Sequence, residues 1–351
     1  MKKSLKKPSK PRVNFFQWRV PIWIFIVLSG AVFITLLSFN IYIRKSTPSQ
    51  VASAVEPDNC DGAFHRLRLK DYPFISPLLF VDMNGQSESF NDLKSSVATM
   101  IGQKKIEGQI NSASVYMKKL KNGEWFAVNS GESFYTASLM KVAVLITILK
   151  MSESNQGYLD TLYPFRYADP RIPKQTFGEK TIVPGHDYKI RDLLYYMIVY
   201  SDNYASNILN NLMDQNVYTK LFSDIGIQGY DPTDQFRKLS ASEVGRLFSL
   251  LYNSSYLSSE NSEYALSLLS QSSFKDGLVK ELPHDVVVAH KFAEAGGLEE
   301  NELHDAGIVY TGKTPYLLIV MTRGKKLSDL SKSIGDISKE VYDHMNPGVA
   351  N

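Results

Sequence analysis

Hydrophobic residues recur three or four positions apart near residue 95 and again near the C-terminus, and this spacing predicts an amphipathic helix at each place. Between these helices, short apolar runs bounded by polar or glycine-containing segments predict five strands. The helical positions are Leu93, Val97, Met100 and Ile101, then Leu327, Leu330, Ile334, Ile337 and Val341. The strands are expected near residues 114–117, 125–128, 286–292, 306–311 and 315–322. Each end of this region therefore combines a helix with strands.

The middle of the region has a helical pattern. Residues 142–149 form an apolar run that is long enough for a buried helix, and Ser240 with Glu243 matches a capping box before another apolar run. Helices between two sets of strands predict an α/β (α+β) fold, in which an antiparallel sheet flanked by terminal helices joins an all-helical subdomain. A catalytic cleft would lie between the two parts.

The N-terminal segment predicts a membrane anchor. Residues 20–43 carry no charge, and at about 1.5 Å per residue a helix of this length spans about 36 Å, more than the roughly 30 Å hydrocarbon core. The basic residues before it place the N-terminus in the cytoplasm. We expect a cytoplasmic tail (1–19), a single transmembrane helix (20–43), an extracytoplasmic linker (44–85) and a globular domain (86–346). A signal peptide cleaved near Ala52-Ser-Ala54 is the alternative.

Composition narrows the function classes. The net charge of +3 comes from the tail, because residues 20–351 carry 32 basic and 36 acidic side chains, a net charge of −4. This balance gives no case for nucleic-acid binding. Cys60 is the only cysteine, so no internal disulfide is possible. The six histidines, at positions 65, 186, 284, 290, 304 and 344, show no metal-ligand spacing, and no metal or cofactor is implied.

Ser138 and Lys141 are the first candidates for chemistry. A serine hydroxyl becomes a good nucleophile when a neighbouring base takes its proton, and a lysine three positions later on a helix lies on the same face. The apolar run that follows is expected to bury the lysine and to lower its pKa toward the range in which the neutral amine is a base.

Two further motifs follow in chain order. Ser201-Asp202-Asn203 comes after an apolar helical run, and Lys291 comes after the strand-like residues 286–289. The order Ser-x-x-Lys, Ser-Asp-Asn and a strand lysine resembles the motif set of class A β-lactamases and penicillin-binding proteins. The sequences around the second motif and over the last two strands also resemble this superfamily. The resemblance covers roughly residues 86–346 and implies the β-lactamase/transpeptidase-like fold.

The resemblance implies an acyl-enzyme mechanism with three catalytic residues. Ser138 would attack an acyl carbon, Lys141 would take or relay its proton, and Ser201 would pass a proton to the leaving nitrogen. The implied substrate is a β-lactam or a small peptidoglycan-like peptide.

Four other positions receive supporting roles from the same resemblance. Asn203 would hold the substrate amide and fix Lys141, and Lys291 would supply positive charge for a substrate carboxylate. The backbone N–H of Glu294 would complete the oxyanion hole with that of Ser138. Asp202 is expected to be structural.

The sequence departs from the superfamily in two places. The lysine motif continues with Phe292 and Ala293, where the family has threonine and glycine, so the hydroxyl that helps to bind a carboxylate is replaced by a ring. The glutamate that activates the deacylating water in class A β-lactamases has no counterpart, although Asp231 or Asp234 could replace it. We therefore expect that Ser138 is acylated and that the acyl-enzyme is hydrolysed slowly. We also expect Phe292 to weaken the binding of substrates that depend on a carboxylate, and Phe292→Thr to restore part of that binding.

Three functions remain open. The chain is a membrane-anchored serine hydrolase of this superfamily, a binding or scaffolding protein that keeps the fold without turnover, or an esterase or amidase for another small acyl substrate. The residues do not indicate the oligomeric state.

Overall fold

The computed structural model describes residues 64–69, 72–174, 176–227, 238–297, 299–312 and 314–347. The expected tail, transmembrane helix and first part of the linker lie outside these residues. Within the described residues, no helix combines the length and the apolar character needed to cross a bilayer.

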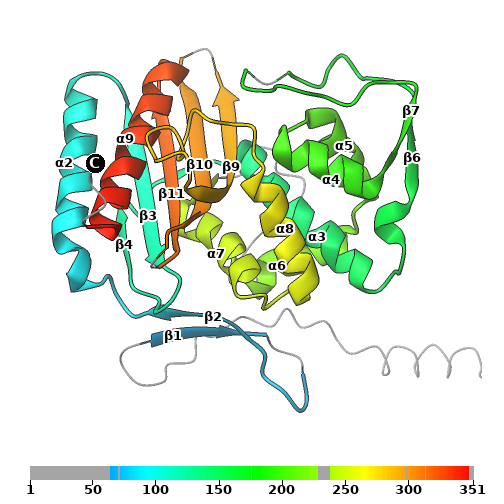
Figure 1. Cartoon of the computed structure of the whole chain (residues 1–351), viewed down its shortest axis with the longest axis horizontal. Coiled ribbons are helices and arrows are strands. Elements are labelled where there is room, and N and C mark those ends of the chain that lie inside the picture. The colour runs from blue at the N-terminus through cyan, green and yellow to red at the C-terminus, as the bar shows by residue number, and fades with distance from the viewer. Residues whose placement is uncertain are drawn as a thin grey trace, which may run out of the picture. The chain divides into compact units, whose positions relative to one another are not determined.

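A five-stranded antiparallel sheet forms the centre of the described domain (Figure 1). Its strand order is β4-β3-β11-β10-β9, so β3, from the N-terminal part of the domain, lies beside β11, the last strand of the sequence. All five expected strands are present; β4 has the expected bounds, and the other four are longer than the sequence indicated. Their bounds are β3 Ser112–Lys119, β4 Trp125–Val128, β9 Val287–Gly296, β10 Asn301–Tyr310 and β11 Tyr316–Gly324.

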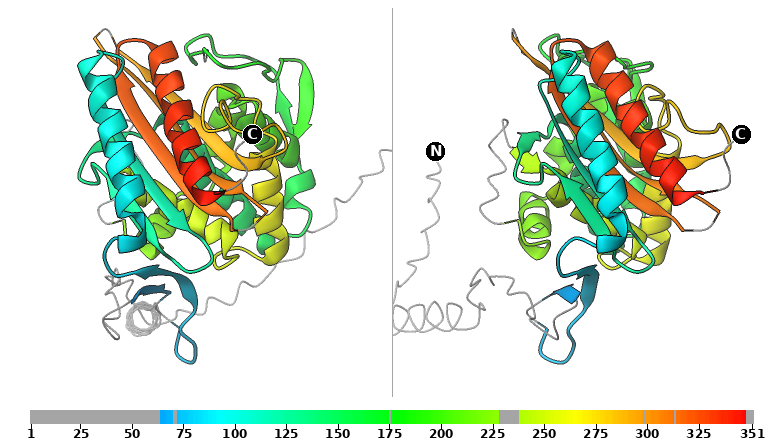
Figure 2. Two further views of the ribbon diagram at one scale, coloured as in Figure 1. Left: turned by 60° about the vertical axis from the view of Figure 1, so that its left-hand side comes forward. Right: turned by 90° about the vertical axis from the view of Figure 1, so that its left-hand side faces the viewer.

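The two terminal helices cover one face of this sheet, as predicted (Figure 2). They are α2, Asn91–Ile106, which follows the short 3₁₀ helix η1, Glu88–Phe90, and α9, Leu327–Met345. Their apolar stripes bury side chains such as Val97 and Ile334 against strand residues such as Val320. Burial of these stripes excludes water from one side of the sheet.

The helical subdomain covers the other face and forms a second core. Helix α3 is buried along its first nine residues, which explains why its sequence is apolar on all sides. Helix α7 begins with the predicted capping box, in which the Glu243 N–H donates to Ser240 Oγ and the Ser240 N–H donates to the Glu243 carboxylate. The helices are η2 Ala137–Met140, α3 Lys141–Glu153, η3 Tyr158–Asp160, α4 Ile190–Val199, α5 Asn203–Leu212, α6 Gln215–Asp224, α7 Ala241–Tyr252 and α8 Ser259–Ser270.

Within the described residues, three strand pairs lie outside the main sheet. They are β1 Phe64–Arg68 with β2 Leu78–Met83, β5 Ser133–Tyr135 with β8 Lys238–Ser240, and β6 Leu162–Phe165 with β7 His186–Lys189. Residues 72–77, which contain two prolines, lead into strand β2. The pairing of β2 with β1 was not indicated by the sequence, because the partner strand lies in a polar stretch. Leu67, Leu79 and Phe80 join the core on the side of the helical subdomain.

The close approach of β9 and β10 depends on Gly307, which pairs with His290 in the sheet register. A Cβ at this position would lie 2.8 Å from the carbonyl oxygen of Ala289, which cannot move away without disturbing the ladder. We expect Gly307→Ala to lower the free energy of unfolding by about 1–3 kcal/mol, the usual effect of overpacking. Gly312→Ala is the matched control, because its Cβ would meet nothing within 4 Å. Equal urea midpoints for the two variants would contradict this account.

Candidate active site

The segment that carries Ser138 is held in an unusual backbone conformation. Ser138 lies in η2, directly before α3, so Lys141 is the first residue of the α-helix. Ala137 precedes the serine with φ of 42°, in the left-handed region that residues with a Cβ seldom adopt. Such strain persists only where the surrounding packing enforces it, and it concentrates at functional sites. Both Ser138 and Lys141 are buried.

Lys141 reaches across to the second motif. Its Nζ donates to Ser201 O at 2.5 Å, to Ser201 Oγ at 3.2 Å and to Asn203 Oδ1 at 2.7 Å. Ser201 has φ of 56°, which turns its carbonyl and its hydroxyl toward the lysine at the same time. Asp202 is structural, as expected, because its side chain accepts from the N–H groups of Ala205 and Ile182.

Lys291 approaches Ser201 from the sheet. It lies in the middle of β9, not at its end, and its Nζ donates to Ser201 Oγ at 2.7 Å and to Phe292 O at 2.8 Å. The serine oxygen thus accepts from both Lys141 and Lys291. Because two lone pairs are engaged in this way, the hydroxyl proton of Ser201 remains to be donated to another group.

Burial controls the charge of both lysines. Desolvation lowers the pKa of Lys141 to about 7, while the carboxylates of Asp202 and Glu294 oppose this effect. Desolvation, and then the nearby charge of Lys141, lower the pKa of Lys291 well below its ordinary value. Asp305 and Glu294 act in the opposite direction. Near neutral pH, Lys141 can therefore exchange a proton with a neighbouring hydroxyl.

A cavity of about 750 Å³ opens beside these groups. Ser138, Lys141, Asn203 and Glu294 line it, whereas the side chains of Ser201 and Lys291 are buried outside its lining. Four of the six predicted site residues therefore face one cavity, and hydrogen bonds connect the other two to it.

A loop between β6 and β7 forms part of the cavity wall, and the sequence gave no sign of this role. Pro173 O accepts from Asn203 Nδ2 at 2.8 Å, and the Thr176 N–H donates to Glu294 Oε1. Ile172, Pro173, Lys174 and Thr176 all line the cavity. The loop residues are neither charged alike nor periodic, so only the fold reveals that they meet the site.

Phe292 does not point into this cavity. Its ring is fully buried and stacks on Phe274 with centroids 4.1 Å apart, and Phe177 of the β6–β7 loop packs edge-on at 6.2 Å. Lys291 Nζ lies 4.2 Å from the centre of the Phe292 ring. The ring therefore takes the space beside the lysine and anchors the loop. Because Phe292→Thr would remove these contacts, it would cost core packing and would not simply restore the carboxylate site that we expected.

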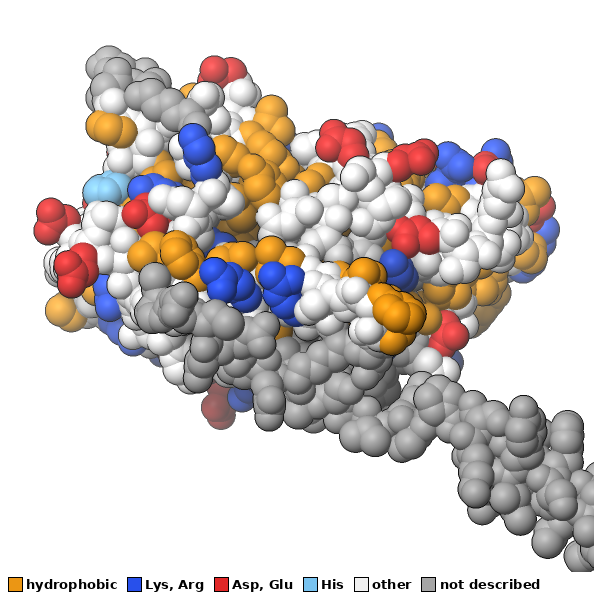
Figure 3. All heavy atoms as spheres, turned by 90° about the horizontal axis from the view of Figure 1, so that it is seen from below, with side chains coloured by type: hydrophobic (Ala, Val, Ile, Leu, Met, Phe, Trp, Pro, Cys, Tyr) orange, Lys and Arg blue, Asp and Glu red, His pale blue; other side chains and the backbone are white. Residues whose placement is uncertain are grey.

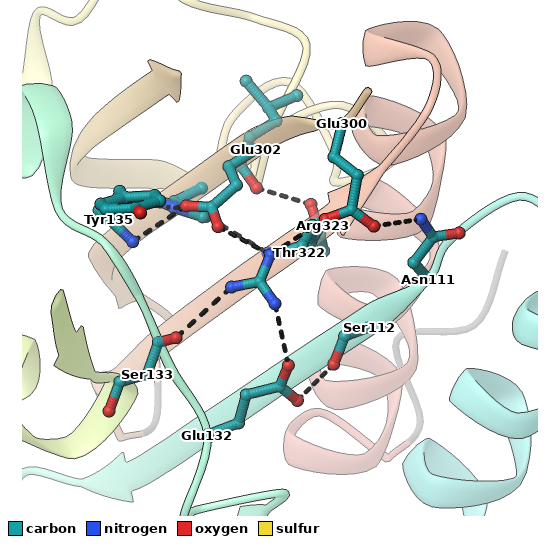
Figure 4. A network of polar contacts seen from close by, with 11 residues as sticks. Asn111, Ser112, Glu132, Ser133, Tyr135, Glu300, Glu302, Thr322 and Arg323 are labelled. Carbon is teal, nitrogen blue, oxygen red and sulfur yellow. Dashed lines mark hydrogen bonds and ion pairs between the residues drawn. The ribbon is translucent and has the colours of Figure 1, made fainter. Parts of the chain in front are cut away.

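A polar network holds β5, the strand that precedes Ser138 (Figure 4). Arg323 Nε contacts Glu302 Oε1 at 2.8 Å, and Arg323 also bonds Ser133 O. The other carboxylate oxygen of Glu302 accepts from the Tyr135 N–H at 2.9 Å. Burial would raise the pKa of Glu302, but its hydrogen bonds with His304 and Arg323 lower it overall. These contacts hold β5, which ends three residues before Ser138.

The two sheet histidines are packed polar residues. His304 Nδ1 accepts from the Thr322 N–H, so its Nε2 carries the proton and donates to Tyr135 O at 3.0 Å. His290 lies on the edge strand β9 but is buried, with Nδ1 3.0 Å from the Asp305 carboxylate. Among the described residues, no three His, Cys, Asp or Glu side chains gather as a metal site.

A family model described as "Beta-lactamase enzyme family" matches residues 92–345. The chain belongs to the beta-lactamase enzyme family. No curated protein matches the sequence.

Solved structures of this family superpose on most of the chain. A class A β-lactamase from Bacteroides cellulosilyticus gives a TM-score of 0.63 at 21% identity, over 75% of this chain and 99% of that one. TLA-1 extended-spectrum β-lactamase gives a TM-score of 0.62 at 17% identity, over 74% of this chain and 99% of that one. PBP-A gives a TM-score of 0.60 at 20% identity, over 73% of this chain and 96% of that one. At these identities the likeness shows the fold, and the predicted β-lactamase/transpeptidase-like class is confirmed.

Asp231 and Asp234, which could replace the missing glutamate, lie outside the described residues. Among the described residues that line the cavity, the one carboxylate belongs to Glu294. The sequence assigned only the backbone of this residue to the site.

The pKa of Lys141 predicts how acylation depends on pH. If the neutral amine takes the proton of Ser138, the protonated form is inactive, so the acylation rate should rise through about pH 7 and then level off. The measurement is the second-order rate of covalent labelling by benzylpenicillin between pH 5 and pH 9. Lys141→Arg should abolish the rise, because arginine stays protonated over this range. A wild-type rate that falls as pH increases would contradict the assignment.

Proposed function

We propose that the chain is a serine hydrolase that forms an acyl-enzyme at Ser138 and hydrolyses it slowly. The observation that carries the proposal is the pair of lysines that meet at Ser201 Oγ, beside a cavity lined by Ser138. This arrangement supplies a base near the nucleophile and a hydroxyl that can return a proton to a leaving nitrogen. A mutant of PBP-A solved as an acyl-enzyme complex with penicillin G supports β-lactams as substrates or probes.

The roles of the other residues follow from the same geometry. Asn203 Oδ1 fixes Lys141, while its amide nitrogen is held by the β6–β7 loop. The backbone N–H groups of Ser138 and Glu294 are the proposed oxyanion donors, because both residues line the cavity. Lys291 keeps Ser201 in place and adds positive charge.

Slow deacylation is proposed because the chain lacks the glutamate that activates the deacylating water in the family. Hydrolysis of the acyl-enzyme needs a water held by a base, and the sequence has no glutamate at the family position. Loss of a general base typically reduces the rate by about a hundred- to ten-thousandfold. The proposed behaviour resembles that of a penicillin-binding protein more than that of a resistance enzyme.

The test is covalent labelling followed by turnover. Incubation with benzylpenicillin should add one equivalent of acyl group, detected by intact-protein mass, with a burst and then slow release. Ser138→Ala should abolish the adduct, whereas Ser206→Ala, a serine in the wall of the same cavity, should retain it. No adduct on wild type would favour a binding protein without turnover. Steady-state hydrolysis as fast as that of an efficient β-lactamase would refute slow deacylation.

We also propose that residues 20–43 form a transmembrane helix that anchors the catalytic domain to the outer side of the cytoplasmic membrane. The uncharged run and the basic tail support this topology. The β1–β2 connection adds support, because Phe74 is 95% exposed and Tyr72 and Ile75 are more than half exposed. Figure 3 views the molecule from below, and hydrophobic side chains lie there beside lysine and arginine side chains. Aromatic and basic residues together suit a bilayer interface.

Protease treatment of spheroplasts tests the topology. We expect the large domain to be degraded from outside while a short fragment that contains the tail stays protected. Protection of the whole domain would reject the orientation. A mature N-terminus near Glu56 would show cleavage in place of anchoring.

A further inference from the structure

The connection between β1 and β2 exposes a group of large apolar side chains. Tyr72, Phe74, Ile75 and Leu78 are 52%, 95%, 62% and 40% exposed, and they are four of the ten large apolar side chains that are exposed in the described part of the chain. Single apolar side chains are ordinary on a protein surface, whereas a contiguous group marks an interaction site. We call these four residues the hairpin tip, and their exposure indicates that a partner covers them.

The rest of the hairpin is fixed to the domain. Phe80 is buried in the core, and Trp125 Nε1 donates to Met83 O at 2.8 Å. The Leu69 N–H donates to Pro77 O at 2.9 Å across the connection. Figure 2 shows the hairpin extending away from the sheet and its helices, so the hairpin tip lies apart from the core that holds the base of the hairpin.

The hairpin and the catalytic cavity lie at opposite ends of the main sheet. Through β11, Ser112 at the start of β3 shares a register row with Glu302, which is next to the cavity-lining Asn301. Near the other end of β3, Lys118 forms an ion pair with Asp82 of β2. Strand β3 has 8 residues, so its ends are about 23 Å apart at about 3.3 Å per residue. Figures 1 and 2 show the hairpin and the β9–β10 turn at opposite ends of the domain.

The order of the chain favours a lipid surface as the partner of the hairpin tip. The uncharged run ends at residue 43 and β1 begins at Phe64, so residues 44–63, 20 in number, separate the proposed anchor from the hairpin. Even fully extended, 20 residues span at most about 70 Å, which keeps the hairpin near the membrane. Residues 64–78 also carry three Lys or Arg and one acidic residue, and a basic excess beside aromatic side chains suits an anionic bilayer.

We propose that the hairpin tip inserts into the bilayer interface, and that this second attachment holds the domain with its catalytic cavity directed away from the membrane. The inference rests on the proposed anchor and goes beyond it, because one attachment does not set which side of the domain faces the lipid, whereas two attachments do. The anchor keeps the hairpin close to the bilayer, so a modest affinity is enough for insertion. Ser138 then meets substrates that arrive from the aqueous side, and a substrate held in the bilayer does not reach it.

The test places a fluorescent label on the hairpin tip of the full chain. Cys60→Ser removes the only cysteine, and Phe74→Cys then gives a single site for the environment-sensitive dye NBD. Ile106→Cys is the matched control, because Ile106 is an 83% exposed apolar residue that ends α2, six residues before β3 begins. Each labelled chain is reconstituted in vesicles of phosphatidylcholine and phosphatidylglycerol, with and without a lipid that carries a nitroxide near its headgroup. We expect the nitroxide to lower the emission at position 74 by about twofold or more and to leave that at position 106 unchanged.

A second measurement tests the orientation of the domain. In the chain labelled at Ile106→Cys, energy transfer from NBD to rhodamine-labelled lipid headgroups should increase when Phe74→Ser and Ile75→Ser are added, because the domain then has one attachment and the cavity end can approach the lipid. Both substituted side chains are exposed, so the core is unchanged. Equal energy transfer with and without these substitutions overturns the orienting role.

Extraction with alkaline carbonate separates the hairpin from the anchor. A chain that stays in the vesicles while the label at position 74 is not quenched retains the anchor and overturns insertion of the hairpin tip. A chain that carbonate releases, but whose label at position 74 is quenched before extraction, refutes the anchor and retains the hairpin contact. Blue-shifted emission at position 74 that the nitroxide lipid does not quench shows that a protein surface covers the tip, such as a second copy of this chain, and also overturns the proposal.

Discussion

The burial of Lys141 is the constraint around which this site is organised. An ammonium removed from water needs acceptors, and the fold provides them from the Ser201–Asn203 segment, sixty residues away in the sequence. Because Asn203 also holds Pro173, the same lysine fixes the loop that closes the cavity. A single desolvated charge thus connects the nucleophile helix, the second motif and the cavity wall.

Backbone strain accompanies this arrangement. Ala137, directly before Ser138, and Ser201, which accepts hydrogen bonds from Lys141, both have positive φ. Two sets of contacts hold these turns. The Asp202 carboxylate caps α5, and the Arg323–Glu302 pair holds β5 ahead of Ser138 (Figure 4). The residues of both networks lie outside the lining of the cavity, so the strain is maintained by contacts that leave the cavity itself open.

The sheet side of the site differs in chemical character from the family pattern that the sequence implied. An aromatic cluster of Phe177, Phe274 and Phe292 occupies the region beside Lys291, and Glu294 adds a negative charge to the cavity. The Phe292 ring removes a polar contact for an anion, while the Glu294 carboxylate interacts electrostatically with Lys141 and Lys291.

The sequence by itself determined the sheet, the terminal helices, the capped helix α7 and the residues of the three motifs. These features depend on local periodicity and on residue types at short spacing, which the chain displays directly. The fold class needed the family resemblance as well. Only the tertiary structure decided the rest: the pairing of β1 with β2, the loop contacts of Thr176 and Phe177, the inward packing of Phe292, and the unpaired carboxylate oxygen of Glu294. Each of these joins segments far apart in the chain, and which partners meet there depends on how whole elements pack, which no local pattern records.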